Sequence, residues 1–490
     1  MSRPRLVIAG THSGAGKTTV TLALMAALKA RGLVVQPFKA GPDFIDPGHH
    51  QAVIGRPSRN LDGWMLGESA NRAIFARASA DADLSIIEGM MGLFDGSSPV
   101  HEQGSTAELA KQLNAPVLLV IDGSAMARSA AAMASGYAKF DPAVQVRGVL
   151  FNRVRSEGHY QLLRQAVESE TDLAVVGYLQ PDASVTIQDR HLGLRTAIEQ
   201  GQGDLYERLA RAAAQTIDLD RVEAMARSAG ECPGEDLPIT RPAATQQPVR
   251  VGLAYDAAFC FYYQDNLELL ESVGAEIVRF SPLHDDELPV ADLLYFGGGY
   301  PELYGETLAA NMSMRSAVQT FARRGGAVYA ECGGLMYLTE AIRDGAGARH
   351  EMVGVFPAEA VMRKNGMTLC YRTVEIAESC MLGGAGTVVR GHEFHYSMLE
   401  PTGELHHACT LSDAAGKPVG QDGLTRGNTL ALYSHLHFGS HPAVVADLLV
   451  KLLVLLGRDL ALRPRPERRR LVHGLPLVLQ HLLLLLRVPL

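Results

Sequence analysis

Two segments of this 490-residue chain carry residue types and spacings that could do chemistry, and the two chemistries differ. The first is a glycine-rich loop, Gly10–Thr18 (GTHSGAGKT), which follows an apolar stretch. The second is a cysteine in a bend of small residues, Ala330–Gly334 (AECGG). The loop suits a nucleoside triphosphate and the cysteine suits covalent acyl chemistry. The chain is therefore predicted to couple ATP cleavage to transfer of a group that the cysteine releases.

The glycine-rich loop predicts a cradle for phosphates. Backbone N–H groups and the start of the next helix converge on the anion, while a lysine adds charge and a hydroxyl holds Mg²⁺. Thr11 replaces the first glycine of the usual G-x-x-x-x-G-K-T pattern, which indicates a subgroup of such loops. A simple glycine-rich turn is the alternative. The predicted ATP-binding residues are Gly10, Thr11, Gly14, Gly16, Lys17, Thr18, Thr19 and, for an adenine edge, Asn152.

Two acidic segments, KAGPDFIDP and EGMMGLFDG, follow the second and third predicted strands. The carboxyl ends of parallel strands face the ligand crevice, and Mg²⁺ that bridges phosphates needs one or two carboxylates there. Thr18, Asp43 and Glu88 are the predicted metal ligands. Asp46 and Asp95 are predicted to position a substrate. Helix capping and turn formation are the alternative roles of these carboxylates.

Acyl transfer at the second site needs a nucleophile, a base and donors for an oxyanion. Cys332 follows a predicted strand, and the glycines after it permit the sharp turn of a nucleophile elbow. His435 is the predicted base, and His437 is the weaker alternative. A lone buried cysteine is usually a packing residue, so the prediction depends on the three features together. The predicted backbone donors to the oxyanion or the substrate are those of Gly298, Gly299 and Gly333.

The elements that must position these residues alternate between short apolar strands and amphipathic helices such as Thr19–Ala30. Strands that are apolar without strict alternation indicate a parallel sheet covered on both faces. The predicted strands are Arg5–Ala9, Leu33–Phe38, Leu84–Ile87, Val117–Ile121, Arg147–Phe151 and Ala174–Tyr178.

Residues 231–248 have no hydrophobic period and are predicted to be a linker. The rhythm restarts beyond it, so the fold class is α/β in both domains. The predicted organisation is a P-loop domain at 1–230, a second α/β domain at 249–445 and an atypical basic, Leu-rich tail at 446–490. The strands and helices predicted for the second domain are Val249–Ala254, Glu276–Phe280, Leu293–Phe296, Ala327–Ala330, Asp265–Val273 and Ser313–Arg324.

Composition limits the class of protein: 47% hydrophobic and 20% charged residues are typical of a globular protein of two or three domains. The net charge is −8, and residues 451–490 hold eight Lys or Arg against two acids, so the remainder is more acidic still. This charge argues against nucleic-acid binding. Six scattered cysteines without CxxC spacing predict neither a zinc site nor a disulfide framework, and they favour the cytoplasm. Neither a signal peptide nor a run of about 18 apolar residues is found, so no membrane contact is expected.

The two chemical segments resemble known families. Gly10–Thr18 is similar to the dethiobiotin-synthetase-like branch of P-loop proteins. Gly297–Glu302 and Ala330–Gly334 are similar to class I glutamine amidotransferases, whose domain is flavodoxin-like. Across residues 3–445 the chain resembles the cobyrinic acid a,c-diamide synthases, or CobB/CbiA family. The motifs that carry this resemblance are, in order, KAGPDFIDP, EGMMGLFDG, DRHLGL, ECGGLMYL, GHEFHYS and HLH.

The resemblance implies a ligase of cobalamin biosynthesis that amidates the a- and c-acetate side chains of cobyrinic acid. Cys332, assisted by His435, would form a glutamyl thioester and release ammonia. Ammonia would pass internally to the first domain and react there with an acyl phosphate made from ATP. The implied cofactors are ATP and Mg²⁺, the implied partners are glutamine and a corrinoid acid, and a homodimer is kept as a hypothesis. Arg190, His191, His392 and His395 are hypothesised to contact the carboxylates of the corrinoid ring, with hydrogen bonding at the surface or between domains as their alternative role.

Departures and alternatives remain. The usual amidotransferase triad ends in His-Pro-Glu, whereas this chain reads His435-Leu436-His437, a lack that the resembled family shares. The segment from Lys451 onward matches nothing in the family. Alternative substrates are hydrogenobyrinic acid and a nickel-tetrapyrrole acid. Cobyric acid synthase is a less favoured relative, and a P-loop regulatory switch with a degenerate amidotransferase domain is the alternative from another class.

Overall fold

The computed structural model describes residues 3–182, 189–190, 193–194, 196–200, 204–232, 248–363 and 366–457. The chain divides into two compact units, Met1–Leu237 and Pro238–Leu490. The division falls within the segment predicted as a linker, most of which lies outside the described residues. Within the described residues, no helix combines the length and apolar character needed to cross a membrane.

The first unit is built on a seven-stranded sheet in the order β3-β2-β4-β1-β5-β6-β7. All neighbouring strands run parallel, as predicted. Both faces are buried, which explains why these strands are apolar throughout. Only the short β3 was not predicted. The strands are β1 Arg5–Gly10, β2 Val35–Ala40, β3 Arg59–Leu61, β4 Leu84–Gly92, β5 Val117–Asp122, β6 Val146–Asn152 and β7 Ala174–Tyr178.

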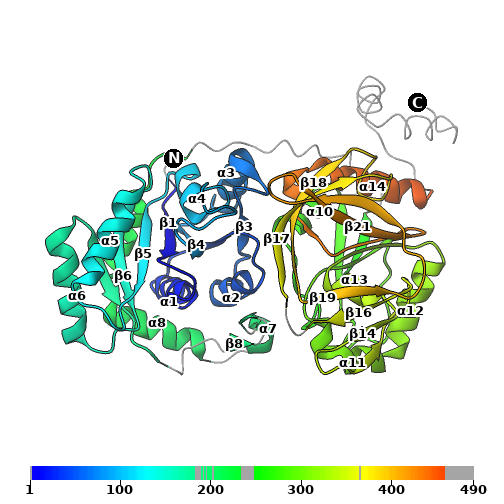
Figure 1. The fold of residues 1–490 in the computed structure, drawn as a ribbon, viewed down its shortest axis with the longest axis horizontal. Helices are drawn as coiled ribbons and strands as arrows, with labels where there is room; N and C mark the ends of the chain where they lie inside the picture. Colours follow the sequence, from blue (N-terminus) through cyan, green and yellow to red (C-terminus); the bar gives the residue numbers. More distant parts are fainter. Residues whose placement is uncertain are drawn as a thin grey trace, which may run out of the picture. The chain divides into compact units, whose positions relative to one another are not determined.

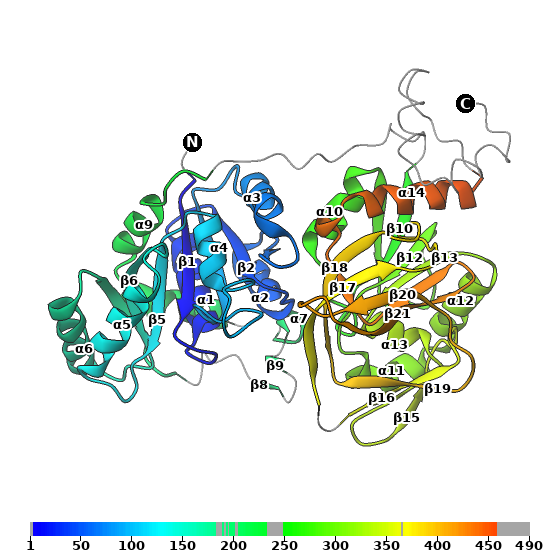
Figure 2. The ribbon, with the colours of Figure 1, turned by 45° about the horizontal axis from the view of Figure 1, so that its top comes forward.

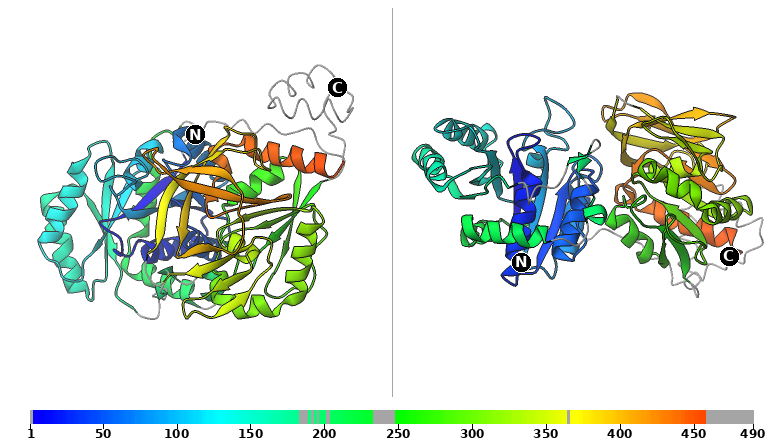
Figure 3. Two further views of the ribbon diagram at one scale, coloured as in Figure 1. Left: turned by 45° about the vertical axis from the view of Figure 1, so that its right-hand side comes forward. Right: turned by 90° about the horizontal axis from the view of Figure 1, so that it is seen from below.

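Helices cover both faces of this sheet (Figure 1). Alternate residues of β1 show the division: Val7 packs toward one layer of helices and Ile8 toward the other. One layer consists of α3 Gly67–Ala78, α4 Thr106–Gln112, α5 Ser129–Phe140 and α6 Glu157–Glu170. The other consists of α1 Lys17–Ala30, α2 Ile45–Ile54, α8 Leu205–Thr216 and α9 Leu219–Arg227. Helix α8 lies beside α1 (Figures 1 and 3).

The second unit contains a ten-stranded sheet in the order β11-β10-β12-β13-β22-β21-β20-β17-β18-β23. Its first five strands are parallel, and the others pair antiparallel. The α/β class is confirmed, but the antiparallel half was not predicted. The strands are β10 Val249–Ala254, β11 Ala275–Phe280, β12 Leu293–Phe296, β13 Ala327–Glu331, β17 Thr368–Ile376, β18 Val388–His395, β20 His407–Ser412, β21 Pro418–Arg426, β22 Thr429–Leu432 and β23 His435–Leu436.

A four-stranded sheet in the order β15-β14-β16-β19 adjoins this larger one in the same unit. Helices pack on both faces of the parallel strands (Figure 2). The small sheet comprises β14 Ala341–Arg343, β15 Arg349–Glu351, β16 Ala358–Met362 and β19 Ser397–Pro401. The helices are α10 Gln264–Ser272 and α14 Ala443–Leu455 on one face, and α11 Gly305–Ala310, α12 Met312–Arg323 and α13 Gly333–Leu338 on the other.

Helix α14 changes the predicted end of the second domain. Leu448, Leu449, Leu452 and Leu453 are buried in the core that also contains β10 and β12. The boundary predicted at residue 445 falls inside this helix, which continues to Leu455. Of the predicted tail, residues 458–490 lie outside the described part of the chain.

Candidate active sites

The loop between β1 and α1 has the backbone of an anion cradle. Gly14 and Gly16 adopt φ values of 85° and 96°, in the left-handed region that favours glycine. Neighbouring elements fix the start of the loop, because Thr11 N–H donates to the Val120 carbonyl at 3.2 Å and the Tyr137 hydroxyl donates to the Thr11 carbonyl. The loop is thus shaped before a nucleotide arrives, as phosphate binding requires.

Asn152, at the end of β6, supports this loop. Its side-chain nitrogen donates to the Ala15 carbonyl at 3.0 Å. A Cβ atom added to Gly16 would lie 1.9 Å from that nitrogen, so only glycine allows the approach. The amide of Asn152 thus already holds the loop, and its contact with an adenine edge stays a prediction.

A buried charged cluster lies beside the loop, at the end of β2 and in the middle of β4. The Thr18 hydroxyl donates to Glu88 Oε1 at 2.7 Å and lies 3.4 Å from both carboxylate oxygens of Asp46. Lys39 Nζ donates to Glu88 Oε1 at 3.0 Å and also to Asp46. His50 Nε2 contacts Glu88 Oε2 at 2.7 Å. Thr18 and Lys39 thus both contact the carboxylates of Asp46 and Glu88.

Burial disfavours the charged form of both Asp46 and Glu88, but the net shifts of their pKa values are opposite because their neighbours differ. Burial, with repulsion from Asp43 and Glu88, raises the pKa of Asp46 well above its ordinary value. Despite burial, Lys39 and His50 hold the pKa of Glu88 well below its ordinary value. Glu88 therefore keeps its negative charge more readily than Asp46 does.

The structure distinguishes Asp43, which was predicted to bind the metal, from Asp46, which was predicted to contact the substrate. Asp43 Oδ1 accepts the N–H groups of Ile45 and Asp46 at 2.8 and 3.2 Å and so starts helix α2. Asp46, predicted as a substrate contact, lies against Thr18 instead. A hydroxyl and two carboxylates form the hard-oxygen donor set that suits Mg²⁺. We therefore favour Thr18, Asp46 and Glu88 over the predicted Thr18, Asp43 and Glu88.

Lys17 and Asp95 are the remaining predicted charged residues near the phosphate loop. Lys17 is buried, and burial and the nearby Lys39 lower its pKa, whereas Glu88, Asp46 and Asp95 act in the other direction. Asp95 is exposed, and its Oδ2 accepts the Gly92 N–H at 2.9 Å. Lys39 and His50 were not predicted as site residues, although Lys39 opens the KAGPDFIDP motif.

Cys332 occupies the sharp bend between β13 and α13. Its φ and ψ are 47° and −102°, an unfavourable conformation for a residue with a Cβ atom. Its N–H donates to the Leu432 carbonyl at 2.7 Å, and its Sγ lies 3.6 Å from the Phe394 carbonyl. Burial, with the negative charge of Glu302, raises the pKa of the thiol. This strained, buried bend has the form predicted for a nucleophile elbow.

The loop of Gly297–Gly299 contacts both predicted partners in acyl chemistry. A Cβ atom on Gly298 would lie 2.3 Å from Cε1 of His435, so the histidine ring packs directly on this loop. On the cysteine side, Gly334 N–H donates to the Gly297 carbonyl at 3.0 Å. The structure therefore brings the Cys332 bend, the glycine loop and His435 together.

The predicted oxyanion donors need one correction. The Gly298 N–H donates to the Phe261 carbonyl at 3.3 Å, and the Phe261 N–H returns to the Gly298 carbonyl at 3.0 Å. This bridge uses the Gly298 donor, so it is not available to an oxyanion. A Cβ atom on Gly333 would lie 3.1 Å from the Gly299 nitrogen, which places these two backbones side by side. Gly299 and Gly333 remain the predicted donors.

Two further histidines, His392 and His437, both contact Tyr263. His392 stacks on His435 with ring centroids 4.9 Å apart, and its Nδ1 contacts the Tyr263 hydroxyl at 2.9 Å. His437 accepts the Gly439 N–H at 3.1 Å through Nδ1 and packs on Tyr263, which favours His435 as the base.

Two of the four residues predicted to contact the corrinoid carboxylates lie near Cys332 and His435. His392 stacks on His435, and His395 stacks on Tyr433 at 4.1 Å, so both lie at the centre formed by Cys332 and His435. The backbone of Arg190 lies in the short hairpin of β8 Asp189–Arg190 and β9 Gly193–Leu194. His191 lies outside the described residues.

The protonation states of Cys332 and His435 predict how activity depends on pH. Burial, with repulsion from His395, lowers the pKa of His435 to about 3, so the imidazole is neutral and able to accept a proton. The raised pKa of Cys332 means that the thiolate fraction still increases above neutral pH. We expect kcat/KM for glutamine hydrolysis to rise continuously between pH values of about 6 and 9. Initial rates across that range test this, and a plateau beginning near pH 7 would contradict it.

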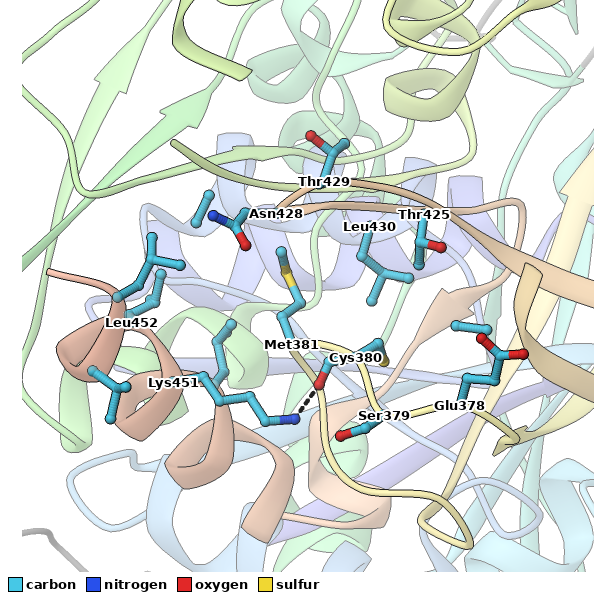
Figure 4. Close-up of a pocket in the computed structure, with 16 residues that line it drawn as sticks. Glu378, Ser379, Cys380, Met381, Thr425, Asn428, Thr429, Leu430, Lys451 and Leu452 are labelled. Atoms are coloured by element: carbon cyan, nitrogen blue, oxygen red, sulfur yellow. Dashed lines mark hydrogen bonds between the residues drawn. The ribbon is translucent and has the colours of Figure 1, made fainter. Parts of the chain in front are cut away.

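A cavity of about 460 Å³ lies elsewhere in the second unit, between α14 and the sheet (Figure 4). Cys380, Met381, Asn428 and Leu452 contribute to its walls. The amine of Lys451 donates to the carbonyls of Cys380 and Gly383 at its edge. Neither Cys332 nor His435 lines this cavity, so it plays no part in the chemistry assigned above.

Comparisons with known families match both units. The CobQ/CobB/MinD/ParA nucleotide binding domain matches residues 6–194. The CobB/CobQ-like glutamine amidotransferase domain matches residues 250–443. These ranges contain the phosphate loop with its charged cluster and the Cys332–His435 centre, respectively.

Whole-length relatives are similar to the chain across both ranges. A cobyrinate a,c-diamide synthase of Syntrophotalea carbinolica is 47% identical over 448 residues, which cover 90% of this chain and 97% of the relative. The enzyme of the same name from Priestia megaterium is 45% identical, covering 91% and 96%. That of Salmonella typhimurium is 43% identical, covering 90% and 96%.

Proposed function

Because this chain belongs to the cobyrinate a,c-diamide synthase family, we propose that it amidates the a- and c-acetate carboxylates of cobyrinic acid with ATP and glutamine. It is a glutamine-dependent ligase of cobalamin biosynthesis. The observation that supports the finer proposal is the presence of both complete sets of reactive groups in one chain. One set surrounds Cys332, and the other surrounds Lys17.

At the first reaction centre, His435 accepts the thiol proton as Cys332 Sγ attacks the side-chain carbonyl carbon of glutamine. The backbone N–H groups of Gly299 and Gly333 stabilise the oxyanion. When the C–N bond breaks, the leaving nitrogen takes the proton from His435 and departs as ammonia. Water then hydrolyses the glutamyl thioester to glutamate and restores the thiol.

At the second reaction centre, a ring carboxylate oxygen attacks the γ-phosphorus of ATP and ADP leaves. The loop amides and Lys17 hold the transferred phosphoryl group and its developing charge. Ammonia then attacks the carbonyl carbon of the acyl phosphate, forming the carboxamide and releasing phosphate. Thr18, Asp46 and Glu88 would hold Mg²⁺, which neutralises phosphate charge when bound.

The metal content of the ring is testable with purified protein. The chemistry takes place on peripheral carboxylates, so the structure gives no basis for contact with the central cobalt. We propose cobyrinic acid as the substrate because the relatives carry that name. Parallel reactions with cobyrinic acid, hydrogenobyrinic acid and a nickel-tetrapyrrole acid, followed by mass spectrometry, decide the choice. A higher kcat/KM with either alternative would replace this proposal.

A further inference from the structure

The backbone that carries His435 has little regular support. Strand β23 consists only of His435 and Leu436. Its partner β18 pairs with it at two positions, Gly391 with Leu436 and His392 with His435. Buried polar side chains from other elements supply further hydrogen bonds to the segment around the histidine.

Two of those side chains bracket the histidine. Asp422 accepts the N–H groups of Tyr433 and Ser434 at 2.9 and 3.0 Å. On the other side, Asn266 donates to the Leu436 carbonyl at 2.7 Å and accepts the Phe438 N–H at 2.8 Å. The backbone is therefore fixed before and after His435.

Glu331 supplies the support nearest to the histidine. Its Oε1 accepts the Leu436 N–H at 3.1 Å and the Tyr329 hydroxyl at 2.7 Å. Its Oε2 accepts the Tyr295 hydroxyl at 3.2 Å. The side chain is only 1% exposed, and burial raises its pKa to about 7. A buried carboxylate is tolerated where its oxygens are hydrogen-bonded, as they are here.

Among these three supports, Glu331 alone is bonded covalently to the nucleophile. Its own backbone continues into Cys332, while its carboxylate holds the residue that follows His435. A movement of this one side chain would change the separation of thiol and imidazole. Such coupling matters because proton transfer and attack need accurate placement of both groups.

We propose that Glu331 is a positioning residue that holds His435 in register with Cys332. It acts through the backbone, because its carboxylate accepts the N–H of the residue that follows His435. In this chain Leu436 and His437 occupy the places of the proline and glutamate of His-Pro-Glu. This inference rests on the proposed glutaminase function of the Cys332–His435 pair. It assigns Glu331 no contact with glutamine.

Two substitutions test this role. Glu331→Leu removes every acceptor, and we expect kcat for glutamine hydrolysis to fall about 10²-fold. Glu331→Gln keeps a carbonyl oxygen for the Leu436 N–H, and the expected loss is about 10-fold, a partial rescue. Amidation driven by ammonium salt should stay within about 2-fold of wild type in both, because it bypasses the cysteine. Tyr337→Phe, which alters another buried side chain of the second unit, should leave both activities unchanged.

The outcomes separate positioning from folding and from the proposed function. Glu331→Gln with wild-type glutamine hydrolysis, or a parallel loss of ammonia-driven amidation, would overturn the proposal. The proposal would also be overturned if Glu331→Gln lowered kcat for glutamine hydrolysis as much as Glu331→Leu does. If Glu331→Leu does not fold, Glu331→Gln with an unchanged melting temperature still decides between these results. Absence of glutamine hydrolysis in the wild type would instead reject the proposed function.

Discussion

Replacing Cys332 with alanine is expected to lower glutamine-dependent amidation on the order of 10⁴-fold, while ammonium salt still drives the reaction at a near wild-type rate. The substitution removes the sulfur that forms the thioester. Alanine is smaller than the buried Cys332 and fits the same space, so the unit should remain folded. Rates of amide formation with each nitrogen source measure the effect.

Cys409→Ala provides the matched control. Cys409 is also a fully buried cysteine of the second unit, but it lies on β20 within the hydrophobic core. Its replacement should cost some stability without changing the ratio of glutamine-driven to ammonia-driven rates. A Cys332→Ala protein that still uses glutamine would show that another residue releases the ammonia.

Replacing Lys17 with alanine is expected to lower amidation about 10³-fold with either nitrogen source, while glutamine hydrolysis persists. Lys17 is the buried cation at the start of α1, beside the glycines that shape the phosphate loop. Its loss removes the charge that stabilises the transferred phosphoryl group. Parallel measurements of ADP, carboxamide and glutamate separate the two reactions.

Lys139→Ala is the control for the loss of a positive charge. Lys139 is exposed on α5 of the same unit and should be replaceable without effect. An ammonia-driven rate that survives in Lys17→Ala would place activation of the carboxylate at another site.

The parallel strands were predictable because burial on both faces makes their sequences apolar throughout. Val117–Ile121 and Val249–Ala254 were recognised for this reason, within a residue of their observed bounds. Strands such as β17 and β21 have partly exposed faces and mixed composition. Their pairing depends on distant segments, which local patterns do not identify.

The reactive groups were predictable where a motif fixes the local backbone, as around Lys17 and Cys332. Choices between neighbouring residues of one motif depended on three-dimensional contacts. Asp43 accepts the first N–H groups of helix α2 while Asp46 lies against Thr18, and only the fold distinguishes them. The Gly298 N–H was assigned to the oxyanion, but a bridge to Phe261 uses it. Lys39 was missed because a buried lysine is recognisable only from its carboxylate partners.

The most direct test of the proposed reaction is its stoichiometry in one mixture of wild-type protein, cobyrinic acid, ATP, Mg²⁺ and glutamine. Carboxamides, ADP and glutamate would be counted together, with isotopically labelled amide nitrogen in the glutamine. The mechanism predicts one ADP and one glutamate for each carboxamide formed, two carboxamides on each ring at completion, and the label in both. Carboxamide formation without ADP, or carboxamides that lack the label, would contradict it.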